Sequence, residues 1–180
     1  MVKVILVNGF PGVGKTTFEK ECIRILRQKD KGIGMICSTV DFVKDVAKFC
    51  GWSGEKTPKN RKFLSDLKMA LTDWNDTPLH KIVEQAQLLA VEKYNYVMFV
   101  DCREPHEIQK LKDRLGVYTI LIRRPKAEEQ EILNSSDASV LDYDYDLTIW
   151  NEYDVEDLTF MAEYFIDRHL DEVKEYEYDY

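Results

Sequence analysis

The sequence lacks long apolar runs, paired cysteines and a surplus of positive charge. No apolar stretch approaches the roughly 18 residues that a membrane span needs, so no contact with a membrane is expected. The four cysteines, at positions 22, 37, 50 and 102, form no CxxC pair and lie near no histidine at metal-ligand spacing. They are typical of reduced thiols. Because the first residues enter a strand-like VKVILV rather than a signal peptide, we expect a cytoplasmic protein.

The charge balance is acidic. The 180 residues include 33 acidic and 25 basic side chains, a formal net charge of −8. Such a chain is poorly suited to binding long nucleic acid through its phosphates, whereas a few convergent cations still suffice for a small anion. The length and the 44% content of hydrophobic residues fit a single globular domain with a sizeable core.

Strand-like and helix-like patterns alternate along the chain. Apolar, β-branched runs predict strands at residues 2–7, 33–37, 96–101, 118–122 and 147–150. Helical spacing of apolar residues fills the segments between and after them, at 15–28, 38–50, 61–74, 79–94, 104–115 and 154–170. This order predicts an α/β fold in three layers, with a central parallel sheet of about five strands and helices on both faces. Two segments that alternate acid and tyrosine, 142–146 and 175–180, are typical of a solvated edge or a frayed tail.

The stretch GFPGVGKTT at residues 9–17 carries the strongest chemical signal. It matches the P-loop pattern, follows a predicted strand and opens a predicted helix, the context in which backbone N–H groups cradle phosphates. Lys15 is expected to reach the β- and γ-phosphates of ATP, and the Thr16 hydroxyl to ligate Mg²⁺. The predicted nucleotide-binding residues are Gly9, Pro11, Gly12, Val13, Gly14, Lys15, Thr16 and Thr17.

An acid and an arginine follow the strand at 96–101. Asp101 closes YVMFVD and is a candidate for the second Mg²⁺ ligand, or else a cap for the helix at 104. Arg103 lies two residues further on, at the strand end where α/β sheets bind ligands. Because a guanidinium grips phosphate with two hydrogen bonds, Arg103 is a candidate for holding the transferred or the accepting phosphate.

Further candidates lie beyond the other strands. Arg123 and Arg124 directly follow the strand at 118–122 and predict a lid over the phosphates, or else two solvated charges. The segment after the second strand and the helix at 61–74 are expected to supply the acceptor pocket. The candidate substrate-binding residues are Thr39, Asp41, Arg61, Lys62, Asp66 and Arg103. For Asp41 a structural alternative stays open, because Ser38-x-x-Asp41 also fits a capping box.

These segments occur in an order that resembles a known family. After the P-loop come STVDFVKDVAKFCGW, RKFLSDLKMALTDWND, FVDCREPHEIQKLK, ILIRRP and NSSDASVLDYDYDLTIWNE. The series resembles the deoxynucleoside monophosphate kinases of bacteriophages and bacteria, within the P-loop nucleoside monophosphate kinase superfamily, and more distantly the animal type of phosphomevalonate kinase. The sequence departs from adenylate kinases, since it lacks their D-G-[FY]-P-R signature and long arginine-bearing lid.

The resemblance implies a P-loop kinase fold and transfer of the ATP γ-phosphate to a (deoxy)nucleoside monophosphate, with ATP and Mg²⁺ as cofactors. It implies catalytic roles for Lys15, Arg103, Arg123 and Arg124. The single domain, 1–180, would carry an acceptor-binding insertion at 38–95, a lid at 123–146 and an acidic tail at 171–180. A non-nucleotide phosphate acceptor and a regulatory NTPase are the alternatives, although no N-K-x-D guanine-reading segment is present. Homodimerisation is left open.

Overall fold

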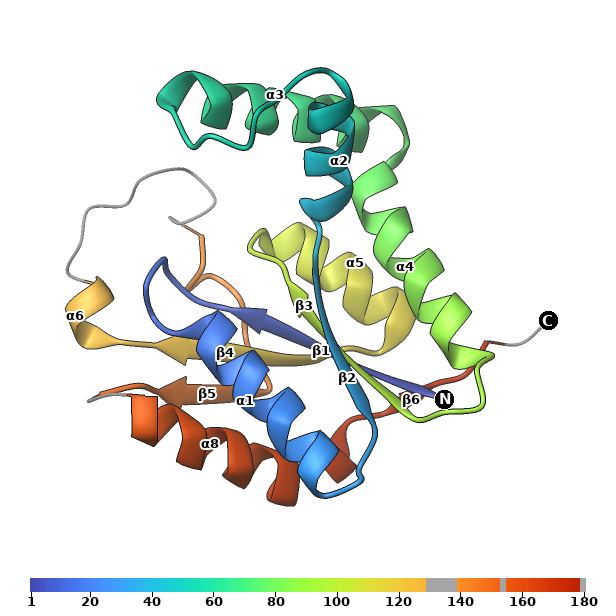
Figure 1. The fold of residues 1–180 in the computed structure, drawn as a ribbon, viewed down its shortest axis with the longest axis vertical. Coiled ribbons are helices and arrows are strands. Elements are labelled where there is room, and N and C mark those ends of the chain that lie inside the picture. Colours follow the sequence, from blue (N-terminus) through green and yellow to red (C-terminus); the bar gives the residue numbers. More distant parts are fainter. Residues whose placement is uncertain (129–138, 153–154, 179–180) are drawn as a thin grey trace.

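A computed structural model describes residues 1–128, 139–152 and 155–178. Its centre is a sheet of five parallel strands in the order β2-β3-β1-β4-β5, which confirms the predicted fold class (Figure 1). The strands are β1 (Val2–Asn8), β2 (Ile33–Ser38), β3 (Tyr96–Asp101), β4 (Tyr118–Arg123) and β5 (Leu147–Trp150). The connections between them run through helices, as parallel strands require.

Helices cover both faces of the sheet. Helices α1 (Lys15–Gln28) and α8 (Val155–Arg168) pack together on one face, and α4 (Thr77–Ala90) and α5 (Pro105–Leu115) lie on the other (Figure 1). The side chains of a strand alternate between faces, so Ile5 and Val7 enter the first core while Val4 and Leu6 enter the second. A strand buried on both faces explains the continuous apolar runs in the sequence.

Helices α2 (Asp41–Phe49) and α3 (Pro58–Asn75) project from the carboxyl edge of the sheet (Figure 1). Helix α3 fully buries none of its side chains and packs against α2 and α4. It begins three residues earlier than the sequence pattern predicted, because Thr57 accepts a hydrogen bond from the Asn60 amide at 3.2 Å and Pro58 occupies the first turn. Lys68 ties α3 to α5 by ion pairs with Glu104 and Glu107.

The acid-tyrosine segments are more ordered than the sequence suggested. Residues Glu175–Tyr176 form β6, which pairs antiparallel with the start of β1, after the short helix η1 (Leu170–Glu172). Tyr143 and Tyr145 pack against the second core. The expectation of a solvated edge or a frayed tail is therefore wrong for these tyrosines and for β6.

Two further findings concern the predicted lid and the membrane. Helix α6 (Pro125–Glu128) begins the predicted lid region, of which residues 129–138, including Ser136 and Asp137, lie outside the described residues. Within the described residues, no helix combines the length and the apolar character that crossing a membrane requires.

Candidate phosphate-binding site

The P-loop joins β1 to α1 through glycines that no other residue could replace easily. Gly9 and Gly14 have φ angles of 145° and 104°, a region that side chains rarely adopt. A Cβ at Gly9 would lie 2.3 Å from the Ile122 carbonyl oxygen, and one at Gly14 would lie 2.6 Å from Leu158 Cδ1. The loop is thus pressed against β4 on one side and α8 on the other, and this packing fixes its path.

The middle of the loop and the start of α1 are open to a ligand. A Cβ built on Gly12, at φ 82°, would meet nothing within 4 Å, so the backbone there is open to a ligand. No side chain caps the amino terminus of α1, and its first turn carries no acidic residue. The terminal N–H groups and the positive end of the helix dipole therefore favour an anion at this place. The exposed Thr16 stands in the same turn.

Lys15 lies folded over the loop. Its ammonium donates to the carbonyl oxygens of Gly9 at 2.6 Å and Phe10 at 3.0 Å. Asn151, which follows β5, donates from Nδ2 to the Val13 carbonyl at 2.8 Å and so supports the loop from beneath. These contacts hold Lys15 against the loop and tie the loop to the end of β5.

Asp101 lies at the end of β3, in register with Val7 of β1 and Ser38 of β2. Its carbonyl accepts hydrogen bonds from the Thr39 amide and the Ser38 hydroxyl, both at 3.3 Å. Burial raises the pKa of its carboxyl, while the charges of Lys15 and Arg103 lower it. Glu104, not Asp101, occupies the N-cap of α5, so the capping alternative does not apply.

Arg103 lies in the turn between β3 and α5, and Asn8 anchors that turn. Asn8 Nδ2 donates to the Arg103 carbonyl at 3.2 Å and to the Tyr145 hydroxyl at 2.6 Å, while Asn8 Oδ1 accepts from the Gly9 amide at 2.8 Å. A single buried asparagine thus joins the P-loop, the arginine turn and the tyrosine segment. The sequence analysis did not identify Asn8; its only signal was a polar residue that ends an apolar strand.

Arg123 and Arg124 stand at the end of β4. Arg123 is the last residue of that strand, and its guanidinium lies 4.6 Å from the centre of the Trp150 ring. The Arg123 carbonyl accepts from the Asn151 amide at 2.8 Å, which fixes the adjoining end of β5. Arg124 follows as the residue before α6. Both arginines therefore start from the same edge of the sheet as the P-loop.

The acceptor candidates divide into two groups. Thr39 and Asp41 stand at the sheet edge: Thr39 is buried, and Asp41 accepts from the Ser38 amide at 2.8 Å and pairs with Lys44 at 2.9 Å. The first contact joins the residues of the capping box that the sequence offered as an alternative, but the N-cap of α2 is Val40 and no side chain caps it. The other candidates are exposed on α3, where Lys62 and Asp66 pair with each other at 2.7 Å and Arg61 precedes them.

Glu19 is a buried acidic residue that sequence reasoning missed. It lies one turn after Lys15 in α1, its exposed fraction is 0%, and neither carboxyl oxygen has a hydrogen-bond partner among the described residues. Burial raises its pKa to about 8, with a smaller contribution from Asp101, while Lys15 lowers it. The signal was present, because positions 15, 19, 22 and 26 follow one face of the helix.

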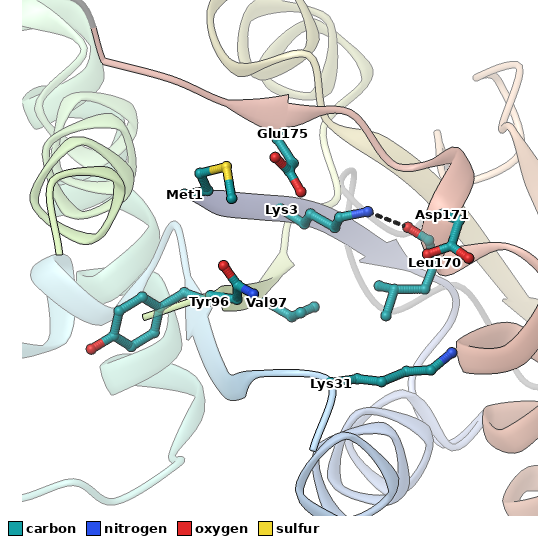
Figure 2. A pocket seen from close by; sticks show the side chains of 9 residues that line it. Met1, Lys3, Lys31, Tyr96, Val97, Leu170, Asp171 and Glu175 are labelled. Atoms are coloured by element: carbon teal, nitrogen blue, oxygen red, sulfur yellow. Dashed lines mark hydrogen bonds between the residues drawn. The ribbon is translucent and has the colours of Figure 1, made fainter. Parts of the chain in front are cut away.

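A hollow lies at the opposite edge of the sheet from the P-loop. Its volume is about 270 Å³, and Figure 2 shows Lys3, Lys31, Asp171 and Glu175 among its lining residues. Lys3 donates to the Leu170 carbonyl at 2.8 Å (Figure 2), and Lys31 donates to the Ile166 carbonyl at 3.1 Å. These lysines satisfy carbonyl groups at and just beyond the end of α8. We therefore interpret the hollow as a structural feature, in which the two lysines complete the hydrogen bonding of the chain at the end of α8.

The chain has the fold of P-loop kinases. It is similar to a shikimate kinase from Aquifex aeolicus, with 15% identity over 91% of this chain and 96% of that one and a TM-score of 0.50. A sugar kinase from Janibacter sp. HTCC2649 shares 15% identity over 97% and 99% of the two chains, with a TM-score of 0.52. A gluconokinase from Sinorhizobium meliloti shares 13% identity over 94% of each chain, with a TM-score of 0.52. No protein-family model matches the sequence, and no curated protein matches it significantly.

Proposed function

We propose that the protein is an ATP-dependent kinase that transfers the γ-phosphate to a (deoxy)nucleoside monophosphate. The observation that carries the proposal is the convergence of cations on the P-loop edge. Lys15 and Arg103 act on the same carboxyl, Asp101, and Arg123 ends the strand beside β1. Transfer of a phosphoryl group between two anions needs positive charge on both of them, and this edge supplies it from three separate segments.

Each group of residues at the carboxyl edge of the sheet has a separate proposed role. The loop from Gly9 to Thr17 would hold the phosphates of ATP, and Lys15 would leave the loop carbonyls to reach the β- and γ-phosphates. Thr16 and Asp101 are suited to hold Mg²⁺, which usually takes one or two protein oxygens in addition to phosphates and water. The metal, when bound, neutralises charge on the transferring group. Arg103 would grip the acceptor phosphate, with Arg123 and Arg124 over the reacting groups.

The acceptor does not need a general base in this reaction. The phosphate of a nucleoside monophosphate is already an anion near neutral pH, so positioning and charge neutralisation carry the catalysis. Helices α2 to α4, within residues 38–95, would form the acceptor-binding arm, and residues 123–146 would form the lid. Closure of the arm and the lid would exclude water and limit hydrolysis of ATP. Homodimerisation would leave these roles unchanged.

A kinase with a hydroxyl acceptor is the second candidate. The similar folds include proteins named shikimate kinase and gluconokinase. A hydroxyl needs a group that takes its proton, and Asp101 and Asp41 are two carboxyls at this edge. Burial raises the pKa of Asp101, with a smaller contribution from Asp41, and a raised pKa favours uptake of a proton. The contact of Asp41 with the Ser38 amide and Lys44 makes Asp41 the less available of the two.

The test is ADP formation from Mg·ATP with each ribo- and deoxyribonucleoside monophosphate, with shikimate and gluconate, and with no acceptor. We expect one or several monophosphates to stimulate ADP formation strongly, with the diphosphate as the second product. Stimulation by shikimate or gluconate alone would establish the second candidate. ADP formation that no acceptor changes would contradict both and favour a regulatory NTPase.

A further inference from the structure

Glu19 is a buried acid without a hydrogen-bonded partner. It belongs to α1 between Phe18 and Cys22 on the side that faces the sheet and α8, and both of those neighbours are fully buried. Neither of its oxygens accepts or donates a hydrogen bond within the described part of the chain. A carboxyl removed from water without compensation is costly, and proteins rarely retain one for stability. Glu19 therefore lacks a hydrogen-bonding group that would compensate for its burial among the described residues.

The surroundings of Glu19 identify the charge of that partner. Side chains in a helix lean toward its amino terminus, so Glu19 leans toward the P-loop. The charged groups that act on it are Asp101, which ends β3, and Lys15, one turn earlier. Asp101 also has a buried oxygen, Oδ1, without a hydrogen-bond partner among the described residues. Lys15 acts on both carboxyls, and Arg103 acts on Asp101 as well. Three buried carboxyl oxygens near the phosphate-binding loop still lack a hydrogen-bond partner among the described residues, and such oxygens favour a nearby cation.

We propose that Glu19 is a positioning residue for the divalent cation of the bound nucleotide, acting with Asp101 to draw that cation to the Thr16 side of the loop. The inference rests on the proposed nucleotide site and adds a residue to it. When Lys15 turns from the loop carbonyls toward the phosphates, its ammonium interacts with the phosphates, which carry more negative charge than the two carboxyls. The cation then balances Asp101 and favours release to solvent of the proton that Glu19 retains without it. Glu19 acts on the cation through the field rather than by direct contact.

The decisive experiment compares ADP binding with Mg²⁺ and with EDTA, by calorimetry, in the parent protein and in Glu19→Gln. The amide fills the same space and cannot ionise when the cation binds. We expect Mg²⁺ to strengthen ADP binding in the parent, and this enhancement to fall by about tenfold in Glu19→Gln, or about 1.4 kcal/mol. Binding in EDTA should stay within about twofold of the parent, because without the cation Glu19 has nothing to attract. The melting temperature of the empty variant should equal or exceed that of the parent.

Two further variants sharpen the comparison. Glu21→Gln removes a charge two residues away that is partly exposed and pairs with Arg24, and it should leave the enhancement unchanged. Glu19→Asp keeps a carboxyl on a shorter stem and should retain more of the enhancement than Glu19→Gln.

Several results would overturn the proposal. An unchanged enhancement in Glu19→Gln is one, and an equal loss of ADP affinity with Mg²⁺ and with EDTA is another, since the second indicates a purely structural role. A Glu19→Gln protein that cannot fold, beside a folded Glu19→Asp, would also contradict it. A parent that binds ADP equally with and without Mg²⁺ defeats this inference but leaves the nucleotide site standing. A parent that binds no ADP defeats the proposed function as well.

Discussion

The two edges of the sheet use their charged side chains in opposite ways. At the amino edge, Lys3 and Lys31 donate to backbone carbonyls at the end of α8 and just after it, and so complete the hydrogen bonding of the fold. At the carboxyl edge, Glu19 and Asp101 keep buried oxygens that no hydrogen bond satisfies within the described residues. Polar groups that a fold leaves unsatisfied under burial are costly, so their accumulation at one edge marks where a ligand is expected.

The same contrast appears in the backbone. The P-loop at the carboxyl edge uses three glycines with positive φ; a Cβ would meet neighbouring elements at Gly9 and Gly14 and nothing within 4 Å at Gly12. At the amino edge, positive φ angles also occur, at Asp30 and Gly32 between α1 and β2 and at Gly116, the C-cap of α5. There the positive φ angles follow the ends of helices, whereas in the P-loop they shape the segment where the phosphates are proposed to bind.

The largest expected effect is the loss of activity in Lys15→Ala. Removing the ammonium should lower the rate of phosphate transfer by about a thousandfold or more, because it withdraws charge stabilisation of the transition state. The fold should persist, because Lys15 is only half-buried and its hydrogen bonds to the Gly9 and Phe10 carbonyls lie within the loop itself. Steady-state kinetics beside circular dichroism would measure both. Near-normal turnover in the folded variant would remove the P-loop edge from the mechanism.

A pair of glycine variants compares packing within the loop itself. Gly9→Ala should destabilise the protein by roughly 3 kcal/mol or more, because its Cβ would fall 2.3 Å from the Ile122 carbonyl oxygen. Gly12→Ala meets no neighbour within 4 Å, and only its φ of 82° opposes the change, at a cost of about 1 kcal/mol. Urea denaturation of both variants gives the two values. Equal destabilisation would mean that the loop is not pressed against β4.

The third prediction concerns pH. The pKa of Glu19 is about 8 in the folded protein against an ordinary value of 4.5, so between these values the folded state retains a proton that the unfolded state has released. Stability should therefore fall as pH rises through this window, with a limiting slope of about 1.4 kcal/mol per pH unit from this group. In Glu19→Gln that contribution disappears.

Unfolding free energies at pH 5, 6, 7 and 8 would test this prediction in the parent and in Glu19→Gln. The difference between the two proteins should widen toward high pH in favour of the variant. A difference that stays constant with pH would show that Glu19 has an ordinary pKa and is not isolated from solvent.

The smallest effect is expected at the amino edge. Lys3→Met keeps the apolar stem and removes one hydrogen bond to the Leu170 carbonyl, so it should cost about 1 kcal/mol of stability. Activity should be unaffected, because the residue lies at the edge opposite the P-loop. Thermal denaturation would measure the loss of stability, and the same kinetic assay would measure the rate of phosphate transfer. A large loss of turnover would mean that the hollow at this edge takes part in function.

Much of the fold could be predicted because the spacing of apolar residues along the sequence indicates its strands and helices. The run YVMFVD predicted β3 with the bounds that the structure shows, and Lys15–Gln28 was predicted as α1 with the same ends. The start of α3 was missed because the Gly- and Pro-rich loop hid Thr57 and Pro58, which begin the helix. The strand β6 was missed because acid-tyrosine alternation resembles a solvated tail, while pairing with β1 is a tertiary interaction that a local pattern does not contain.

The candidate site could be predicted where a motif or a strand end marks it, as for the P-loop, Asp101 and Arg103. Residues whose role depends on packing could not be found in this way. Glu19 is isolated because α1 is covered by α8 and the sheet, and Asn8 matters because Tyr145 returns to it from a distant segment. Sequence spacing places a side chain on a face, but only the assembled fold shows what lies opposite.

The central claim is that phosphate transfer takes place at the carboxyl edge and not at the amino edge. The most direct measurement is acceptor-stimulated ADP formation in Arg103→Ala beside Lys3→Met, each checked for folding by its melting temperature. The account predicts that Arg103→Ala loses about a hundredfold or more, because a guanidinium on the acceptor phosphate is gone, while Lys3→Met keeps the rate of the parent. Near-normal turnover in a folded Arg103→Ala protein would contradict the account.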